Sequence, residues 1–193
     1  MLGKRVWARL LGVEKTVIEG VVYDEEDGAV VASVRPGRGQ RLRCGICRRR
    51  CGRYDVGEGR RRWRTLHLGE MKAYLEADAP RVSCPTHGVV VAHVPWARRG
   101  AGHTRSFDDQ AAWLAVHTSR TAVTEVMRIA WRTVGAICAR VAAERRAAID
   151  QAGWIDRIVA RHCPQAIRCA DPFHVVRWAT DALDEVRRQT WNA

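Results

Sequence analysis

Four side chains that could bind a metal ion occur as two short pairs in the first half of the chain. The first pair is Cys44 and Cys47, and the second is Cys84 and His87. Two residues separate the members of each pair, a spacing that lets one tight turn direct both side chains at the same ion. Three thiolates and one imidazole suit tetrahedral Zn²⁺. The spacing therefore predicts a structural zinc site.

The chain holds seven cysteines, so other ligand sets must be weighed. Cys51 is the main competitor, because the spacing from Cys47 to Cys51 is also usable. The pair that begins at Cys44 is preferred, because it makes the tighter turn and has a second pair of the same form. His67 and His93 are further candidates, and the strand-like pattern around His67 favours a histidine in solvent. A redox-active Cys-x-x-Cys would explain the first pair and leave the second unexplained.

The N-terminus and the hydropathy pattern bear on the compartment. Residues 1–12 contain no long apolar segment with a cleavage site, which predicts that no signal peptide is present. No stretch of about 20 apolar residues could cross a bilayer. These features predict a cytoplasmic, nucleoid-associated protein with no membrane partner. Thiols in a reducing compartment bind metals more readily than they form disulfides.

Most of the formal net charge of +12 lies in one segment. Residues 35–64 contain twelve arginines against two acidic residues. Two runs of three consecutive arginines fall in this segment: Arg48, Arg49 and Arg50, and Arg60, Arg61 and Arg62. Dense guanidinium groups pair with phosphates and release counterions. The segment therefore predicts binding to a polyanion. A folded acidic partner and a solvated basic loop without a ligand are the alternatives.

The N-terminal part of the chain is predicted to be rich in β-strands, which would position the ligand pairs. Runs at 16–22 and 29–34 predict a hairpin with an acidic turn. Runs at 62–68 and 72–79 predict a second pair of strands that ends just before the second ligand pair. Residues 1–95 are therefore predicted to form a small zinc-ribbon domain. The apolar core of such a small domain cannot stabilise the fold alone, so zinc is expected to supply much of the stability. Serine in place of the first cysteine of either ligand pair is therefore expected to abolish folding of residues 1–95.

A basic, glycine-containing linker follows residue 95. Beyond it, apolar residues recur with the 3.6-residue period of α-helices. Ser106 is predicted to cap a helix over 107–117, with Trp113 and Val116 on its buried side. Acidic residues in the first turn of this helix suit the helix dipole.

A short helix over 121–129 and a longer helix capped by Thr133 are predicted to follow. The apolar residues of the longer helix recur at i, i+3, i+4 and i+7, and Arg132, Thr133 and Arg140 lie off that stripe. A short helix, a tight turn and a longer helix are typical of a helix-turn-helix, whose second helix presents its N-terminal residues to base edges in the major groove. Residues 96–148 are therefore predicted to form a three-helix DNA-binding domain.

The last segment of the chain resembles a known protein family. Residues 169–188, which include Asp171-Pro172-Phe173-His174, resemble a segment of bacterial insertion-sequence transposases of the ISL-three family. Other stretches that agree with this family, in the same order, are 74–81, 94–98 and 112–118. Members carry an N-terminal zinc finger, a helix-turn-helix and an RNase H-like DDE nuclease domain. The resemblance implies an α+β chain in which residues 149–193 are a fragment of that α/β nuclease domain.

The resemblance assigns Asp171 as the second of three acidic ligands that hold Mg²⁺ during attack on a phosphodiester. Asp150 is a candidate for the first acid, or for a later acidic position before the next helix, and the strands that would aim it at Asp171 are missing. The third acid is expected beyond residue 193. One carboxylate holds Mg²⁺ poorly, so the resemblance implies that this chain binds no Mg²⁺ and has lost cleavage and strand transfer.

The resulting hypothesis is an internally deleted and C-terminally truncated transposase. It is expected to bind double-stranded DNA at terminal inverted repeats, with itself or a full-length transposase as an oligomeric partner, and not to cut DNA alone. The alternative is a DNA-binding repressor or regulator of transposition or transcription without catalysis. A third hypothesis is an active enzyme with an incomplete gene model. Residues 150–193, without their sheet, are expected to be loosely ordered.

Overall fold

The computed structural model describes residues 3–150, and the side chains of residues 3–145. The chain divides into two compact units, Met1–Gln110 and Ala111–Ala193. Among the described residues, the first unit holds every strand, and the second holds only helices. The predicted combination of a β-rich N-terminal part and a helical part is therefore confirmed.

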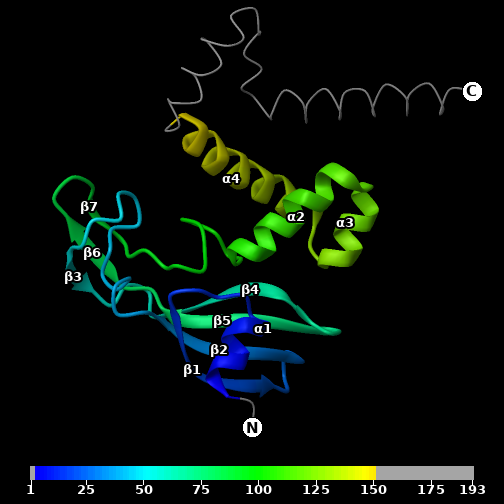
Figure 1. The fold of residues 1–193 in the computed structure, drawn as a ribbon, viewed down its shortest axis with the longest axis horizontal. Helices are drawn as coiled ribbons and strands as arrows, with labels where there is room; N and C mark the ends of the chain where they lie inside the picture. Colours follow the sequence, from blue (N-terminus) through cyan, green and yellow to red (C-terminus); the bar gives the residue numbers. More distant parts are fainter. Residues whose placement is uncertain (1–2, 151–193) are drawn as a thin grey trace, which may run out of the picture. The chain divides into compact units, whose positions relative to one another are not determined.

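The larger of two sheets in the first unit has the strand order β1-β2-β5-β4 (Figure 1). Its strands are β1 (Thr16–Asp24), β2 (Ala29–Pro36), β4 (Arg60–Leu68) and β5 (Met71–Asp78). The two hairpins, β1–β2 and β4–β5, are antiparallel, and β2 pairs in parallel with β5. All four predicted strands are present. A short helix, α1 (Lys4–Leu10), packs against β1.

One face of the large sheet carries the apolar core. In β5, Ala73, Leu75 and Ala77 are buried and alternate with partly exposed residues, as the two-residue period of a strand requires. Trp63 of β4 packs edge to face on Trp96, with ring centroids 5.5 Å apart. The core cluster comprises Leu11, Val13, Ile18, Ala32, Val34, Trp63, Leu75, Ala77, Ala79, Trp96 and Ala97. The large sheet thus has an apolar core that includes no metal ligand.

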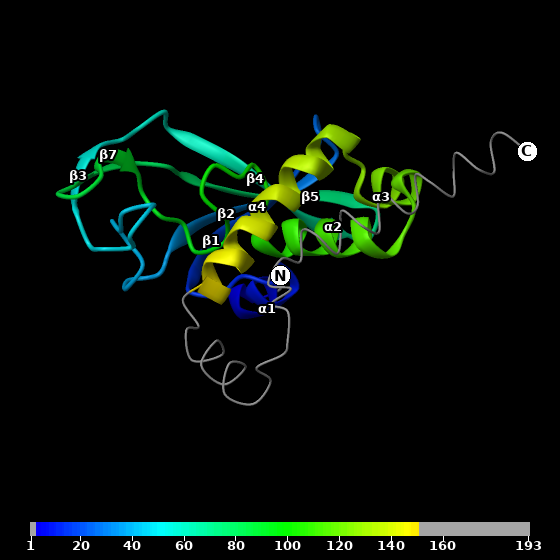
Figure 2. The same cartoon turned by 90° about the horizontal axis from the view of Figure 1, so that it is seen from above.

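The smaller sheet lies at one end of the large sheet (Figure 2). Its order is β3-β6-β7, with β3 (Gly52–Asp55), β6 (Arg81–Cys84) and β7 (Gly88–Val91) all antiparallel. Each strand has only four residues. Within these three strands the buried residues are Val82 and the predicted ligand Cys84, so Val82 is their one buried aliphatic side chain. This sheet was not predicted, because strands this short show no clear alternation.

Helix α2 (Arg105–His117) begins earlier than the sequence predicts. The hydroxyl of Thr104, and not that of Ser106, accepts a hydrogen bond from the backbone N–H of Phe107, at 3.3 Å. Thr104 is buried, and its hydroxyl also donates to the hydroxyl of Thr65 in β4 at 3.3 Å. The prediction that Ser106 caps the helix is therefore wrong, because tertiary contacts place Thr104 at the helix start.

The buried side of α2 also differs from the prediction. Phe107, Asp108 and Ala111 are fully buried. Trp113 and Val116 are 57% and 56% exposed. A residue six positions after Phe107 lies well off the face marked by positions 107 and 111. The predicted burial of Trp113 and Val116 is therefore wrong.

The helical unit contains the predicted helix-turn-helix. Helix α3 (Arg120–Met127) and helix α4 (Trp131–Asp150) are separated by residues 128–130 and pack against each other. Arg128 ends α3 in the left-handed region, with φ 50° and ψ 50°. A left-handed residue directly after a helix is a common way to stop it and turn the chain.

The predicted apolar stripe of α4 is confirmed. Val134, Ile137 and Val141 are buried, and Cys138, the fourth residue of the predicted stripe, is partly buried. Val123 and Met127 of α3 are also buried. The predicted N-cap of this helix is wrong, since α4 already begins at Trp131. Thr133 therefore lies inside the first turn, where its backbone N–H donates to the carbonyl of residue 130 at 2.9 Å.

Ser119 supplies the N-cap of α3, because its hydroxyl accepts a hydrogen bond from the backbone N–H of Ala122 at 3.2 Å. Ser119→Ala is expected to destabilise the helical unit by about 0.5–2 kcal/mol, because one helix N–H loses its acceptor. Urea unfolding followed by circular dichroism measures this loss. Ser119→Asp keeps an acceptor and serves as the control; equal stability of both variants would show that the cap contributes nothing.

Several predictions fall outside the described residues. They concern the nuclease fragment at 149–193, of which only the end of α4 is described, and the order of its tail. The first unit extends past residue 95 to Gln110, and the predicted three-domain division stays a prediction. In the part of the chain that the structure describes, no helix is long and apolar enough to cross a membrane.

Candidate metal centre and nucleic-acid interface

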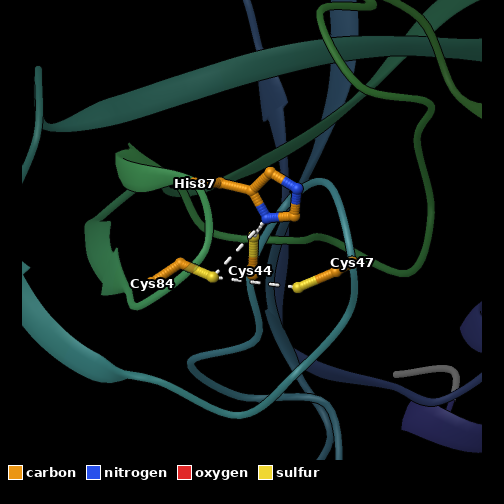
Figure 3. Close-up of side chains that lie close together, drawn as sticks. All are labelled: Cys44, Cys47, Cys84 and His87. Atoms are coloured by element: carbon orange, nitrogen blue, oxygen red, sulfur yellow. Dashed lines mark hydrogen bonds between the residues drawn. The ribbon is translucent and has the colours of Figure 1, made fainter.

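The two predicted ligand pairs meet beside the small sheet (Figure 3). Cys44 and Cys47 lie on the turn before β3, which we call the first knuckle (residues 44–47). Cys84 is the last residue of β6, and His87 lies on the turn into β7. The β6–β7 hairpin therefore positions one pair, and the first knuckle positions the other. The four ligand atoms all lie within 4.8 Å of one another.

The distances between these atoms test whether zinc fits. Zn–S bonds of about 2.3 Å and Zn–N bonds of about 2.0–2.1 Å in a tetrahedron place two sulfurs about 3.8 Å apart, and a sulfur and a nitrogen about 3.6 Å apart. The Sγ atoms of Cys47 and Cys84 are 3.8 Å apart. The Nδ1 atom of His87 lies 3.6 Å from the Sγ atoms of both Cys44 and Cys84. The arrangement is consistent with a tetrahedral zinc ion held through Nδ1.

Backbone hydrogen bonds shape the first knuckle. The N–H of Ile46 donates to the Sγ atom of Cys44 at 3.4 Å, and the N–H of Arg48 donates to the carbonyl of Cys44 at 3.0 Å. Arg48 adopts a left-handed conformation with φ 62°. A Cβ atom on Gly45 would lie 2.5 Å from the carbonyl oxygen of Val91. Glycine therefore allows the first knuckle to approach the end of β7 closely.

The thiols of the site differ in acidity. Burial raises the pKa of Cys84, but the backbone N–H of Thr86 and the ring and backbone N–H of His87 oppose it and lower the pKa to about 6. The backbone N–H of Arg49 lowers the pKa of Cys47, while burial and the neighbouring thiols of the site outweigh it and raise the pKa. Cys84 is therefore more readily ionised than Cys47, and a zinc ligand binds as the thiolate.

The other ligand candidates from the sequence are placed elsewhere. Cys51 does not belong to the four-residue cluster, and its thiol donates to the carbonyl of Arg49 at 3.4 Å. His67 contacts the guanidinium of Arg64, with its Nε2 2.8 Å from the Nη2 atom. His93 accepts a hydrogen bond from Arg48 through Nδ1. Four protein ligands leave no open position on zinc, which is typical of a structural site and not of a catalytic one.

The second arginine run is largely paired with acidic residues. The cross-strand register places Arg62 opposite Glu76. Glu76 accepts from Arg60 at 2.7 Å and from Arg62 at 3.3 Å, and the Arg60 guanidinium holds the pKa of Glu76 below its usual value. Arg62 also donates to Asp24 at 3.1 Å and to Asp27 at 2.7 Å. The positive charges of Arg60 and Arg62 are thus balanced within the large sheet.

The middle arginine of the same run is held by neutral groups. The Nη2 atom of Arg61 donates to the carbonyl of Ala101 at 2.9 Å. Its guanidinium lies 5.2 Å from the centre of the Trp63 ring. These contacts fix the direction of the Arg61 side chain but do not neutralise its charge.

The first arginine run is different. Arg49 and Arg50 are exposed, and neither side chain has a hydrogen bond or ion pair with another described residue. The same is true of Arg38 and Arg41, which sequence reasoning did not single out. Residues 37–53 contain seven arginines and no acidic residue. The absence of acidic residues from this basic segment is the sequence feature that could have identified Arg38 and Arg41.

The helix-turn-helix residues lie near the start of α4. Arg132 is exposed, and Thr133 and Arg140 are partly buried. The guanidinium of Arg120, at the start of α3, lies 5.5 Å from the centre of the Trp131 ring. Gly135 is exposed, and a Cβ atom there would meet open space. Among the described residues of the first two turns of α4, Arg132 is therefore the exposed cation, and Gly135 adds no side chain beside it.

The two predicted catalytic acids are not brought together by the described residues. Asp150 is the last residue of α4, and Asp171 lies outside the part of the chain that is described. Their roles stay predictions.

Both described units match known families. Residues 40–87 match the zinc-finger of transposase IS204/IS1001/IS1096/IS1165. Residues 92–142 match the helix-turn-helix domain of transposase family ISL3. Curated relatives from two strains of Mycobacterium tuberculosis, CDC 1551 / Oshkosh and ATCC 25618 / H37Rv, each bear the name "Transposase for insertion sequence element IS1557". Each is 43% identical to this chain over 263 residues. No solved structure matches the chain.

The alignment with these relatives covers all of this chain and 59% of each relative, so the chain spans less than two thirds of their length. The aligned length of 263 residues exceeds the 193 residues of the chain. The relatives therefore have internal residues that this chain lacks. The matches agree in order and position with the metal centre and with the helix-turn-helix. The chain belongs to the ISL3 family of transposases and carries that family's zinc ribbon and helix-turn-helix.

Proposed function

We propose that the chain binds duplex DNA at the ends of an insertion-sequence element, through the arginines around the first knuckle and through α4. One observation carries this proposal. Residues 37–53, folded around the zinc ligands, hold seven arginines and no acidic residue, and four of these arginines are exposed without a side-chain partner among the described residues. Unpaired guanidinium groups bind phosphates and release counterions.

Sequence preference would come from α4. Helix-turn-helix proteins place the first residues of the second helix against base edges in the major groove. Arg132 and Thr133 occupy that position, with Arg140 two turns later. The small exposed surface at Gly135 lets the helix backbone approach a groove closely. Phosphate contacts from the first knuckle would fix the register of the protein on the duplex, without reading its sequence.

The chain is proposed not to cut or join DNA alone. The relatives named as transposases have internal residues that this chain lacks. A nuclease site needs several carboxylates that converge on Mg²⁺. Incubation of the chain with element-end DNA and Mg²⁺ is expected to give no cleavage. Cleavage that disappears on Asp171→Ala would refute this part of the proposal.

A second candidate function follows from the same comparison. Both DNA-binding families match this chain, while internal residues of the relatives are missing from it. Such a protein could occupy element ends without reacting and so repress an intact transposase. Adding the chain to a transposition assay with an intact relative tests this function. Dose-dependent inhibition supports repression, and an unchanged transposition frequency contradicts it.

DNA binding is tested by comparing an element-end duplex with a scrambled duplex at about 150 mM salt, where purely electrostatic binding is weak. Tighter binding to the end duplex is expected, and a zinc chelator is expected to weaken it. Equal binding to both duplexes would contradict end recognition, although the basic segment could still bind DNA.

Two double variants separate DNA-binding arginines from structural ones. Arg49→Ala with Arg50→Ala is expected to weaken binding to both duplexes and to lower the slope of log K against log salt by about two, one for each lost phosphate contact. Arg60→Ala with Arg62→Ala removes the same charge. Because these arginines are paired with acids, we expect little change in the slope and a lower melting temperature. If both double variants changed the slope of log K against log salt equally, Arg49 and Arg50 would not differ from Arg60 and Arg62 in binding phosphate, and the assignment of DNA-binding arginines would be wrong.

A further inference from the structure

A groove of about 450 Å³ lies next to the first knuckle in the first unit. Strand β7, residues 92–94 and loop 97–101 line it, together with Arg61 and Trp63 of β4. Gly45 of the first knuckle also lines it, so the groove adjoins the basic segment of residues 37–53.

The groove has an unbalanced positive charge. None of the described residues that line it is acidic, whereas Arg61, Arg98 and Arg99 are among them. Arg98 forms ion pairs with Asp108 and Asp109, so its charge is balanced. Arg61 keeps its charge and is held in direction by Ala101 and Trp63.

Arg99 is the cation of the groove with no evident structural role. It is exposed, and its side chain has no hydrogen bond or ion pair within the described part of the chain. Arg61 and Arg99 together present two charges of one sign at a concave surface. Concave sites lined by one sign of charge attract ligands of the opposite sign.

A second groove offers a useful contrast. It has a volume of about 400 Å³ and is lined by four arginines: Arg35, Arg41, Arg53 and Arg60. It also contains the acids Glu19 and Asp78. Glu19 accepts from Arg35 at 3.0 Å, so part of the charge is already balanced. The first groove is therefore the better anion site.

The apolar lining of the first groove narrows the choice of anion. Val89 and Val91 of β7 are 43% and 48% exposed, which leaves apolar surface next to the two arginines. The sugar–phosphate backbone of DNA alternates an apolar face of deoxyribose with an anionic phosphate. An acidic peptide presents carboxylates on flexible side chains and no comparable ring.

We propose that this groove binds the DNA backbone, with Arg61 and Arg99 contacting phosphate and Val89 and Val91 contacting deoxyribose. This inference rests on the proposed function and extends the interface beyond the first knuckle to the loop at 97–101. The contact is to the backbone, so it adds affinity and does not depend on the base sequence.

The test uses the zinc-loaded full chain and the two duplexes, element-end and scrambled. Arg99→Ala is expected to weaken binding to both by the same factor and to lower the salt slope by about one. Arg99→Lys keeps a point charge and is expected to retain the slope. Arg35→Ala, which removes a partly exposed arginine paired with Glu19, is the control and is expected to leave the slope unchanged.

Phosphate ethylation interference gives a second measurement. One interfering phosphate is expected to disappear in Arg99→Ala. If the unaltered chain binds DNA and Arg99→Ala changes neither the slope nor the interference pattern, the groove inference fails and the proposed function stands. If the unaltered chain does not bind DNA, both fail. Polyglutamate binding that depends on Arg99, with unchanged DNA binding, would assign the groove to an acidic protein and overturn the inference.

Discussion

Cys84→Ser is expected to unfold the small sheet and the first knuckle while the large sheet stays folded. The small sheet has strands of four residues, and the buried side chains of this sheet and the first knuckle include the two ligands Cys84 and Cys44. Burial of Val82 alone supplies about 1.5–3 kcal/mol, which cannot order three strands and a turn. Binding of zinc to small zinc domains is worth about 10–16 kcal/mol.

The large sheet should respond differently. Its core cluster contains Trp63, Leu75 and Trp96 and no zinc ligand. The sequence alone predicts that loss of a ligand unfolds all of residues 1–95. The structure limits the expected loss to the small sheet and the first knuckle, because the two sheets have separate sources of stability.

Hydrogen exchange measured by mass spectrometry tests this directly. Peptides from β6 and β7 are expected to lose protection in Cys84→Ser, and peptides from β4 and β5 are expected to keep it. Treatment of the unaltered chain with a zinc chelator should give the same pattern. Cys51→Ser is the control, because Cys51 lies outside the four-residue ligand cluster and its thiol donates to the carbonyl of Arg49. Unchanged protection of β6 and β7 would refute the zinc assignment.

The parts of this structure that were predictable share one property: they are encoded locally. The ligand spacing of Cys44 and Cys47 needs one turn, and the stripe from Val134 to Val141 needs one helix. The parallel pairing of β2 with β5 joins two hairpins far apart in the sequence, and no local pattern encodes it. The small sheet was missed for a related reason, since its strands have only four residues each and show no clear alternation.

The arginines illustrate the same limit at the interface. Two runs of three arginines are equivalent in sequence, but their surroundings differ after folding. Register places Glu76 opposite Arg62, and the β1–β2 turn adds Asp24 and Asp27. Arg49 gains no such partner among the described residues. Charge density therefore predicts that a polyanion binds, and the tertiary structure indicates which arginines remain to bind it.

Asp108→Ala is expected to destabilise the first unit by about 1–3 kcal/mol, because it removes one of the two carboxylates that pair with the largely buried guanidinium of Arg98. Asp108 is fully buried, and the Arg98 side chain is only 9% exposed. The Nη1 atom of Arg98 lies 3.7 Å from the Oδ2 atom of Asp108, and Nδ1 of His103 lies 3.9 Å from Oδ1. Removal of the carboxylate leaves the guanidinium beside a buried apolar site, with Asp109 as its remaining acidic partner.

A neighbouring acid provides the matched control. Asp109 accepts from the same guanidinium at 2.8 Å, but its side chain is 47% exposed. Water can replace Asp109 when it is removed, so Asp109→Ala is expected to cost no more than about 1 kcal/mol. Urea denaturation, followed by circular dichroism, measures the free energy of unfolding of the two variants. It compares the loss of a buried carboxylate with the loss of an exposed one, both paired with Arg98.

A double variant compares the removal of the whole Arg98–Asp108 ion pair with the removal of Asp108 alone. Arg98→Met with Asp108→Leu replaces both charges by apolar side chains of similar size. Such replacements of buried ion pairs are often neutral or stabilising. The double variant is therefore expected to be more stable than Asp108→Ala, although it contains more substitutions. Equal destabilisation in all three variants would show that Arg98 and Asp108 do not act as a pair. If the double variant recovers stability, the cost of Asp108→Ala comes from a buried guanidinium that has lost one of its two carboxylates. The attraction between Arg98 and Asp108 then contributes little to the stability of the start of α2.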